Sequence, residues 1–308
     1  MIYRCAGSLG LMSTRRRVIA RIKGGLGNQL FCYAAARRLA LVNNAELVID
    51  DITGFVRDHQ YQRRYALDHF HIPVRKATPA ERLEPFDRYR RGVKKWLSSR
   101  KPFVERYYVE QEGTDFDGRL LALKVTGTVY LDGLWQGEGY FKDVEGIIRE
   151  DLRIIPPTDV QNQRSAEEIR NSNAVALHVR WFNEPDSTGT HNVSADYYNR
   201  AIALIDDKVE SPRYFLFSDH PDVARSELNL ADGRVTYVSH NRGDGSAFAD
   251  LWLMTQCRHF ITANSSFSWW GAWLAAPRSK IIIAPGIKLA GVTAWGLEGQ
   301  IPASWIKM

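Results

Sequence analysis

The stretch KGGLGNQLF at residues 23–31 comes directly after the apolar run VIARI at residues 18–22. Glycines between a strand and a helix let backbone N–H groups and the helix N-terminus face a ligand, most often an anion. After the turn, Phe31, Ala35 and Leu39 follow one another at helical spacing, which predicts a helix ending at residues 43–44. A second apolar run at residues 45–49 predicts a buried strand. The chain therefore opens with a strand–helix–strand unit, the building block of parallel sheets.

The whole chain has 308 residues, which is enough for two α/β domains of about 150 residues each. Its apolar content of 44% and charged content of 25% exclude a disordered chain and a membrane bundle. No apolar run reaches the length of about 18 residues that a transmembrane helix needs. Residues 1–17 form a predicted N-terminal extension, in which the arginines follow the apolar residues and so do not resemble a secretory signal. Three widely spaced cysteines fit a reducing compartment, so we predict a cytoplasmic protein.

Strand and helix patterns alternate most plainly in the second half. Helices are expected at 195–206, 221–228, 246–257 and 268–276, between strands at 174–180, 214–217, 234–238, 259–263 and 280–284. This order favours a parallel sheet covered on both faces. In the first half we expect a strand at 128–135, a helix at 140–152, and helices and long loops at the mouth of a cleft over 57–116. The break at Pro156 and Pro157 predicts a first domain over 18–155 and a second over 156–308.

Much of the net charge of +6 lies between residues 57 and 106, where aromatic residues such as Phe86, Tyr89 and Trp96 alternate with basic ones. A solvated basic face explains this composition, and so does attraction to a polyanionic acceptor, an anionic lipid surface or nucleic acid. The aromatic rings could stack on sugars or bases, or belong to an amphipathic helical hairpin packed on a sheet.

In an open parallel sheet, ligands bind outside the carboxyl ends of the strands. His178 and Arg180 end one predicted strand, and Ser218 and Asp219 end another. Arg180 is either half of an internal ion pair or a bidentate ligand for a phosphate. Ser218 and Asp219 could accept hydrogen bonds from a base or ribose, or cap the helix that follows.

The segment NSSFS at residues 264–268 precedes a predicted helix, so its N–H groups and hydroxyls point to where a diphosphate would lie. Capping of the helix by Ser266 or Ser268 is compatible with such a site. The tryptophans at 269, 270 and 273 are predicted to pack in the core. Together the strand ends and this segment predict a nucleotide-diphosphate site without a metal, and the DFD sequence at 115–117 is taken as a chance match.

Four motifs occur in order: GGLGNQLF at 24–31, HVR at 178–180, FSD at 217–219 and NSSFSWWGAWL at 264–274. In this the chain resembles glycosyltransferase family 11, the α-1,2-fucosyltransferases, over about residues 19–285. The resemblance implies a GT-B fold, in which two Rossmann-like domains face each other across a cleft. It also implies GDP-β-L-fucose as co-substrate, inversion at the anomeric carbon, and neither a metal nor another cofactor.

Carried over residue by residue, the resemblance makes Arg180 the holder of the leaving β-phosphate and Asn28 its catalytic counterpart across the cleft. Other residues would bind GDP-fucose, with His178 and Asp219 at guanosine: His178, Ser218, Asp219, Asn264, Ser265, Ser266 and Phe267. Gly25, Gly27 and Gln29 would form the facing lip of the cleft. The family pattern His-x-Arg-Arg-Gly-Asp is broken here, because Trp181, Phe182 and Asn183 follow Arg180. The source of a general base is thus open, with Glu184, Asp186 and His191 as candidates.

The predicted function is therefore transfer of L-fucose from GDP-fucose to the 2-hydroxyl of a galactose-containing oligosaccharide or glycolipid, with peripheral contact at the inner membrane surface and no nucleic-acid partner. One alternative is an NAD(P)-dependent oxidoreductase, because Gly25, Gly27 and Asp50 partly fit a dinucleotide fingerprint in which Leu30 replaces the third small residue. Another is a non-catalytic polyanion- or RNA-binding protein that uses residues 57–106. The last alternative is a member of the same family that has lost its transferase activity.

Overall fold

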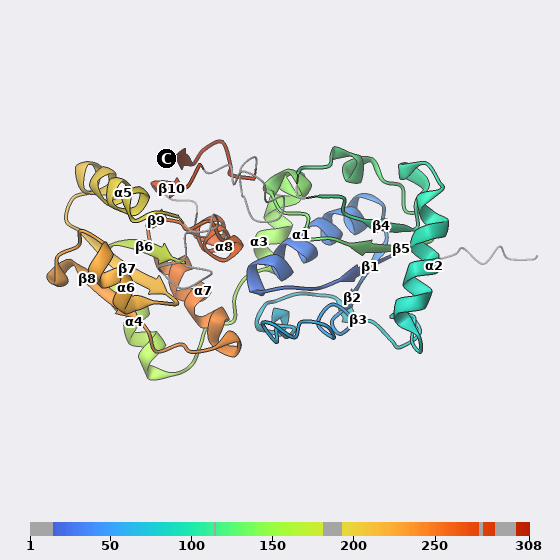
Figure 1. Cartoon of the computed structure of the whole chain (residues 1–308), viewed down its shortest axis with the longest axis horizontal. Helices are drawn as coiled ribbons and strands as arrows, with labels where there is room; N and C mark the ends of the chain where they lie inside the picture. The colour runs from blue at the N-terminus through green and yellow to red at the C-terminus, as the bar shows by residue number, and fades with distance from the viewer. Residues whose placement is uncertain (1–14, 114, 181–192, 277–279, 287–299) are drawn as a thin grey trace, which may run out of the picture.

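The computed structural model describes residues 15–113, 115–180, 193–276, 280–286 and 300–308. It contains two entirely parallel sheets, one in each half of the chain (Figure 1). The first sheet has the order β3-β2-β1-β5-β4 and the second β11-β10-β9-β6-β7-β8. The predicted architecture of two Rossmann-like α/β domains is therefore confirmed. The domain boundary at residues 155–156 stays a prediction, and it falls between α3 (Glu145–Asp151) and α4 (Val160–Arg170).

The first sheet is built on the strand–helix–strand unit that opens the chain. Its strands are β1 (Arg17–Arg21), β2 (Glu46–Asp50), β3 (Arg75–Lys76), β4 (Tyr108–Glu110) and β5 (Thr128–Asp132). The central residues of β1 and β2 are buried on both faces of the sheet. Helix α1 (Leu26–Val42) ends at Asn43 as predicted, and twelve of its 17 residues are buried. Such an all-round burial is expected of a helix that lies between two layers rather than on a surface.

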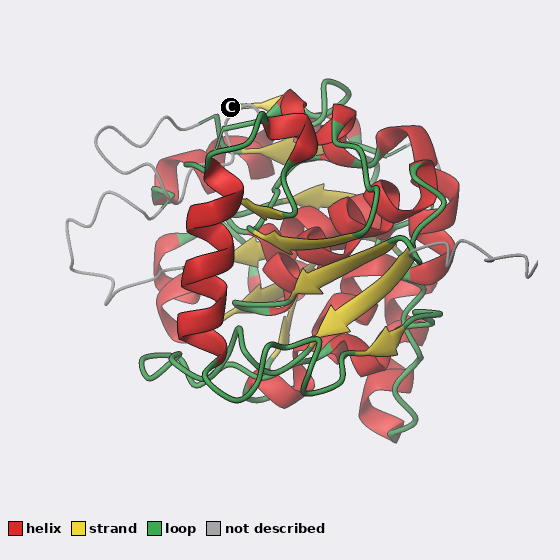
Figure 2. Cartoon of the chain, turned by 90° about the vertical axis from the view of Figure 1, so that its right-hand side faces the viewer, coloured by secondary structure: helices red, strands yellow, loops and turns green. Residues whose placement is uncertain are grey.

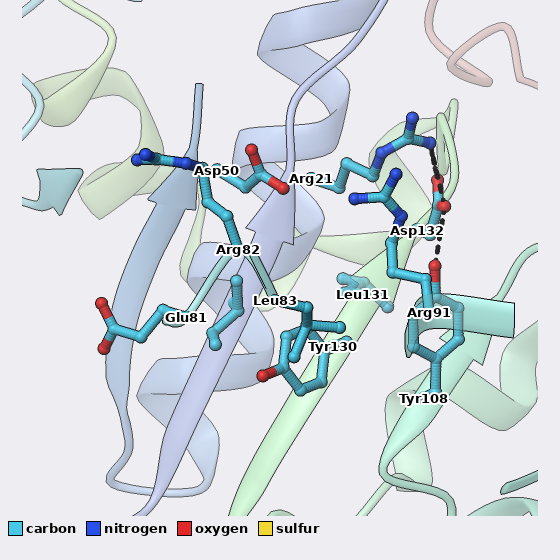
Figure 3. Close-up of a pocket in the computed structure, with 11 residues that line it drawn as sticks. Arg21, Asp50, Glu81, Arg82, Leu83, Arg91, Tyr108, Tyr130, Leu131 and Asp132 are labelled. Carbon is cyan, nitrogen blue, oxygen red and sulfur yellow. Dashed lines mark hydrogen bonds and ion pairs between the residues drawn. The ribbon is translucent and has the colours of Figure 1, made fainter. Parts of the chain in front are cut away.

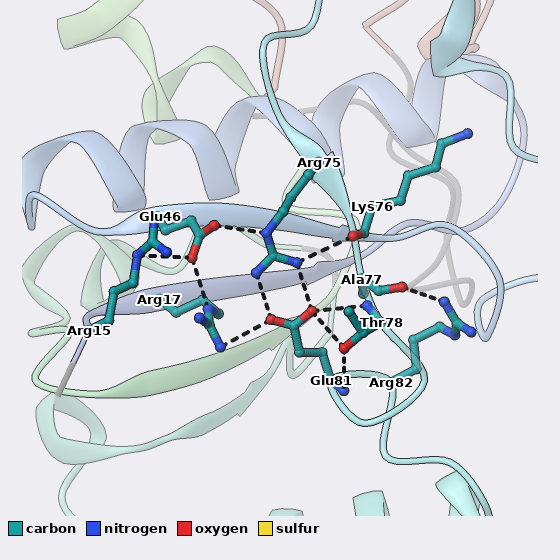
Figure 4. Close-up of polar contacts among 9 residues, drawn as sticks. All are labelled: Arg15, Arg17, Glu46, Arg75, Lys76, Ala77, Thr78, Glu81 and Arg82. Atoms are coloured by element: carbon teal, nitrogen blue, oxygen red, sulfur yellow. Dashed lines mark hydrogen bonds and ion pairs between the residues drawn. The ribbon is translucent and has the colours of Figure 1, made fainter.

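Strand β3 and strand β4 were not predicted, since neither shows an apolar alternation. Both residues of β3 are exposed, and an ion-pair network holds this edge strand in place (Figure 4). Arg75 contacts Glu46 at 2.8 Å and Glu81 at 2.7 Å, while Arg17 on β1 reaches the same two carboxylates at 3.0 Å. The network therefore ties three neighbouring strands together at their charged ends.

The second sheet follows the predicted alternation closely. Its strands are β6 (Asn173–Val179), β7 (Pro212–Ser218), β8 (Val235–Val238), β9 (His259–Ile261), β10 (Ile282–Ala284) and β11 (Ile306–Lys307). The helices around it are α4 (Val160–Arg170), α5 (Ala195–Lys208), α6 (Pro221–Glu227), α7 (Ala247–Gln256) and α8 (Ser266–Leu274). The predicted helix over 140–152 is instead two short 3-10 turns followed by α3 (Glu145–Asp151). Helix α8 begins at Ser266, two residues earlier than predicted.

An aromatic cluster joins the two domains where α1 meets α8. The ring of Phe31 lies 4.7 Å from Trp269 and 4.8 Å from Trp270, and Phe141 stacks on Trp270 at 5.5 Å. All these rings are buried, as is Trp273, so the prediction that the tryptophans pack in the core is confirmed. One apolar core therefore runs through both halves of the chain.

Helix α2 (Asp87–Ser99) corrects the prediction that residues 57–116 form the mouth of a cleft. It stands at the end of the molecule remote from the second domain, and Figure 2 shows it beside the first sheet. It packs near β4, where the Ser98 hydroxyl donates to the carbonyl of Tyr108 at 3.0 Å. From this region Arg63 and His69 approach the second domain, as described below.

Candidate functional site

Three motifs of the sequence meet at the N-terminus of α8. Ser265 is the N-cap residue, and its hydroxyl accepts a hydrogen bond from the backbone N–H of Phe267 at 3.3 Å. The cap is thus Ser265 and not Ser266 or Ser268, which corrects the predicted capping residues. Ser268 is buried and accepts from the N–H of Ala263 at 3.2 Å, which fixes the chain between β9 and α8. Asn264 is also buried, so a glycan at this asparagine would not fit.

The glycine turn of the first domain lies against this helix start. A Cβ atom at Gly27 would stand 2.5 Å from the carbonyl carbon of Ser266 and 2.7 Å from the nitrogen of Phe267. Only glycine allows that approach. Gly24 has a φ of +77°, in the left-handed region that favours glycine, and Gly25 is the N-cap residue of α1. Gly27 is therefore a contact between domains, whereas the sequence had placed it on an open lip.

Asn28 links the two domains through its side-chain oxygen. Its Oδ1 accepts a hydrogen bond from the Ser266 hydroxyl at 2.9 Å and a second from Nε2 of Gln136 at 2.9 Å. Gln136 follows β5 and was missed, because nothing in its sequence surroundings distinguishes it from a loop residue. The N-termini of α1 and α8 thus adjoin, and both helices direct their positive ends to one place.

Gln29 holds the glycine turn from inside the protein. It is buried, with Nε2 donating to the carbonyls of Gly24 at 2.9 Å and Arg64 at 2.8 Å. Its Oε1 accepts from the N–H of Ala66 at 2.9 Å. Its amide is thus engaged with the backbone, and the structure places Gln29 behind the turn rather than on the predicted lip.

Arg180 and Asp219 meet at the carboxyl ends of β6 and β7. The strand register sets Val179 opposite Ser218, so the next residues of the two strands are neighbours. Nη1 of Arg180 lies 3.1 Å from Oδ2 of Asp219, and both side chains are partly exposed. The sequence allowed Arg180 to be half of an ion pair or a ligand for a phosphate. The structure contains the ion pair. Ser218 does not cap α6; its hydroxyl accepts from the N–H of His220 at 3.0 Å.

His178 precedes this pair on β6 and is buried beside the ring of Phe267, at 5.6 Å between centroids. Burial, together with the charge of Arg180, lowers the pKa of His178 to about 3, so the ring is neutral. Its Nδ1 has no hydrogen-bond partner within the described part of the chain. A buried ring nitrogen of this kind is suited to a polar group of a ligand at the strand ends.

Asp50 and Asp132, at the carboxyl ends of β2 and β5, form hydrogen bonds and ion pairs with other groups of the protein (Figure 3). Asp132 lies 2.7 Å from Lys23 and 3.1 Å from Arg21, and it accepts from the Tyr108 hydroxyl at 3.1 Å. Burial alone would raise the pKa of Asp132, but the two cations outweigh it and hold that pKa below its usual value. Asp50 accepts from the N–H of Thr53 at 2.9 Å in a buried turn. It is therefore not exposed to a ribose, as the dinucleotide interpretation requires.

Further contacts between the domains were not foreseen. Arg63 forms an ion pair with Asp244, and the His69 ring stacks on Phe248 at 3.7 Å. A separate contact lies within the second domain, where the Asn241 side chain after β8 donates to Asp250 at 2.8 Å. Burial raises the pKa of Asp250 to about 7 although this hydrogen bond lowers it. Sequence patterns carry no signal for the contacts of Arg63 and His69 with the second domain, because each joins segments that lie far apart in the chain.

The candidate bases Glu184, Asp186 and His191, with Trp181 and Asn183, lie outside the described residues. Within the described ranges, no three His, Cys, Asp or Glu side chains gather as metal ligands would. Cys32 and Cys257 are buried free thiols, which confirms that both are packed in apolar surroundings, while Cys5 lies outside the described part. No helix of that part is long and apolar enough to cross a bilayer.

Comparison with known proteins identifies the family of this chain. Residues 17–294 match the family model described as Glycosyl transferase family 11. The chain is 28% identical to an α-1,2-colitosyltransferase of Escherichia coli, over 94% of this chain and 98% of the relative. It is 29% identical to the O-antigen biosynthesis glycosyltransferase WbnK of Escherichia coli, over 88% and 94%. Its identity to galactoside α-(1,2)-fucosyltransferase 2 of Sus scrofa is 24%, over 82% and 68%.

Two solved structures share the fold. The α-1,6-fucosyltransferase NodZ, soaked with GDP-fucose, has a TM-score of 0.50 and 17% identity, over 90% of this chain and 97% of its own. A variant of Arabidopsis thaliana FUT1 in complex with GDP has a TM-score of 0.55 and 13% identity, over 87% and 70%. At these identities the likeness concerns the fold, and the predicted GT-B arrangement is confirmed.

Proposed function

Because this chain belongs to glycosyl transferase family 11, we propose that it transfers L-fucose from GDP-β-L-fucose to the 2-hydroxyl of a galactose residue, with inversion at the anomeric carbon. The family assignment and the enclosed position of Asp50 argue against the alternative of an NAD(P)-dependent oxidoreductase. Two relatives act with α-1,2 regiochemistry according to their names. The acceptor is an oligosaccharide or glycolipid, and the free buried thiols agree with a cytoplasmic location.

The observation that carries the donor assignment is the meeting of two helix N-termini beside the Arg180 strand end. Helices of 17 and 9 residues direct their positive ends to the contact between Gly27 and Ser266. The two positive helix ends repel each other unless a negative charge lies between or beside them. A bound diphosphate would supply that charge. His178 lies against Phe267 of the same helix start, which connects α8 to the Arg180 strand.

In the proposed reaction, the acceptor hydroxyl attacks the anomeric carbon from the face opposite GDP while the bond to the β-phosphate breaks. Negative charge grows on the leaving diphosphate. Arg180 and the N–H groups at the start of α8 stabilise this charge as preorganised donors, an effect worth roughly 10²–10³ in rate for each donor. The ion pair with Asp219 keeps the guanidinium pointed in one direction. In this role Asp219 orients Arg180, in addition to its proposed contact with guanosine.

On the acceptor side, Asn28 is the proposed positioning group for fucose or the incoming hydroxyl, since it is held from both sides by Ser266 and Gln136. Proton removal occurs late, because the hydroxyl becomes acidic only as it bonds to a cation-like carbon. Glu184, Asp186 and His191 stay candidates for the group that receives this proton.

A second donor deserves a direct comparison, because a relative that aligns along nearly its whole length is a colitosyltransferase. The test is to incubate the protein with GDP-fucose or with the GDP derivative of colitose, together with a panel of β-galactosides. GDP release and the linkage of the product are measured. We expect fucosyl transfer to the 2-hydroxyl; preference for the colitosyl donor would change the sugar but not the site. Neither GDP binding nor turnover with either donor would contradict the proposal.

A further inference from the structure

Helix α2 exposes the side of its surface that an amphipathic helix ordinarily buries. Phe86, Tyr89, Val93 and Trp96 follow one another at intervals of three or four residues and so form one stripe. The exposed fraction is 78% for Phe86, 75% for Tyr89 and 55% for Trp96. The buried residue of this helix is Ser98, whose hydroxyl bonds to the backbone of β4. The apolar stripe of α2 thus faces solvent.

Basic residues flank this stripe. Residues 86–101 contain one acid, Asp87, and seven basic residues: Arg88, Arg90, Arg91, Lys94, Lys95, Arg100 and Lys101. Two of these are directed inward, since Arg91 pairs with Asp87 and Lys94 lies over the Tyr130 ring at 5.3 Å. Arg88, Arg100 and Lys101 are exposed. The guanidinium of Arg100 stacks on Trp96 at 3.3 Å, so cation and aromatic ring share one surface.

The apolar and charged surfaces are continuous. An apolar hollow of about 550 Å³ is lined by Phe86, Tyr89, Val93 and Trp96. A second hollow of about 570 Å³ is lined mostly by charged side chains, five basic and three acidic, and reaches Arg21 and Asp132 at the ends of β1 and β5. Both hollows include Asp87, Arg88 and Gly92. The face of the protein formed by α2 would therefore match a partner that presents an apolar layer next to an anionic one.

We propose that α2 docks the protein on an anionic lipid surface, with Phe86, Tyr89 and Trp96 at the level of the headgroups and the arginines on lipid phosphates. Helices with aromatic apolar faces and basic flanks lie in this way in the membrane interface. The contact goes beyond the proposed transfer reaction and does not depend on it.

Two other occupants fit less well. A symmetric contact between two copies of α2 would bring two strongly basic surfaces together, which costs affinity. Nucleic acid would match the cations and rings but not the exposed aliphatic side chains of Val93 and Leu97, which are 39% and 43% exposed. The helix also stands at the end of the molecule away from the domain contact (Figure 1). Docking there leaves the contact of Asn28 with Ser266 undisturbed.

The test is co-sedimentation of the full chain with vesicles of phosphatidylglycerol or of phosphatidylcholine alone. We expect binding to the anionic vesicles that weakens at about 0.5 M salt. The variant Tyr89→Ser/Trp96→Ser should bind at least about tenfold more weakly, because it removes the rings that enter the interface. The variant Arg88→Gln/Arg100→Gln should bind roughly thirtyfold more weakly, since each cation near an anionic surface contributes about 1 kcal/mol.

The matched control is Val160→Ser/Arg225→Gln, which changes an exposed apolar and an exposed basic residue in the second domain. It should bind as the unchanged protein does. Thermal unfolding and GDP binding of all variants report on the fold and on the transferase site separately. The proposal is overturned if the unchanged protein ignores anionic vesicles or if the control loses as much binding as the α2 variants. It is also overturned if sedimentation velocity shows a dimer that the Tyr89→Ser/Trp96→Ser variant dissociates, or if an RNA oligomer binds to α2 more tightly than the vesicles do.

Discussion

The hydroxyl of Ser266 donates to Oδ1 of Asn28 at 2.9 Å, although 238 positions separate the two residues in the chain. The contact joins the start of α8 in the second domain to the start of α1 in the first. Because Gly27 touches the same turn of α8, the two most distinctive stretches of the sequence form one structural unit. Changes in either stretch should therefore affect both stability and transfer.

Replacing Gly27 with alanine tests the close approach. The new Cβ would overlap the backbone of Ser266 and Phe267, which cannot move as a flexible side chain would. We expect a loss of about 2–3 kcal/mol in the free energy of unfolding, as for other overpacked sites. Gly92→Ala is the control, because its Cβ position in the interior of α2 has no atom within 4 Å apart from the adjoining backbone of the helix itself. That change should stabilise the protein by about 0.5–1 kcal/mol. Denaturant unfolding measures both, and equal effects would contradict the contact.

A double-mutant cycle tests the bond between Asn28 and Ser266. Asn28→Ala and Ser266→Ala should each lower stability, and the pair should show a coupling of about 0.5–1.5 kcal/mol because both remove the same hydrogen bond. Asn28→Ala should also reduce the rate of transfer more than the affinity for GDP. Ser226, exposed on α6, provides the uncoupled partner. An equal loss of transfer and GDP affinity would assign the glycine turn to nucleotide binding instead.

Arg180→Ala should reduce the rate of fucosyl transfer roughly 10²–10³-fold, because charge on the leaving diphosphate loses a preorganised donor. Arg180→Lys should recover only part of the rate, since an ammonium group lacks the planar fork. Asp219→Asn should give a smaller loss by loosening the orientation of the guanidinium. Arg225→Ala removes a comparable ion pair on the surface of α6 and should leave the rate unchanged. Full activity of Arg180→Ala would refute its proposed role.

Asp250 should make the protein less stable as the pH rises. Its pKa is raised to about 7 in the folded state, whereas an unfolded aspartate has a pKa near 3.9. Between these values the folded state holds a proton that the unfolded state has lost, so the free energy of unfolding falls by up to about 1.4 kcal/mol per pH unit. Asp250→Asn should remove this slope and retain the acceptor for Asn241. Unfolding of both proteins at pH 5 and pH 8 measures the difference, which should favour the variant at pH 8.

The sequence predicted five of the six strands of the second sheet, because they are apolar runs separated by helices, and it missed the edge strand β11. It did not predict β3, where Arg75 and Lys76 are exposed and the ion pairs of Arg75 with Glu46 and Glu81 take the place of an apolar face. Three serines stood within reach of the α8 N-terminus, and only the backbone geometry selected Ser265 as the cap.

Their positions at strand ends identified the site residues in the sequence. The distances between these residues could not be predicted in the same way. Strand register decides that Arg180 meets Asp219, and register is set by packing over the whole sheet. For the same reason the position of Gly27 against α8 could not be predicted from its motif.

The rings of Phe31, Trp269 and Trp270 form an apolar seam between the domains. Pulling α1 away from α8 would expose these rings at a cost of about 25 cal/mol for each Å² of apolar surface. If substrate entry requires the domains to move, we therefore expect them to rotate about this seam rather than to separate. The pair of Arg63 with Asp244 and the stack of His69 on Phe248 are the contacts that such a rotation breaks. The seam also couples the domains thermodynamically, so a calorimetric scan should show one cooperative transition.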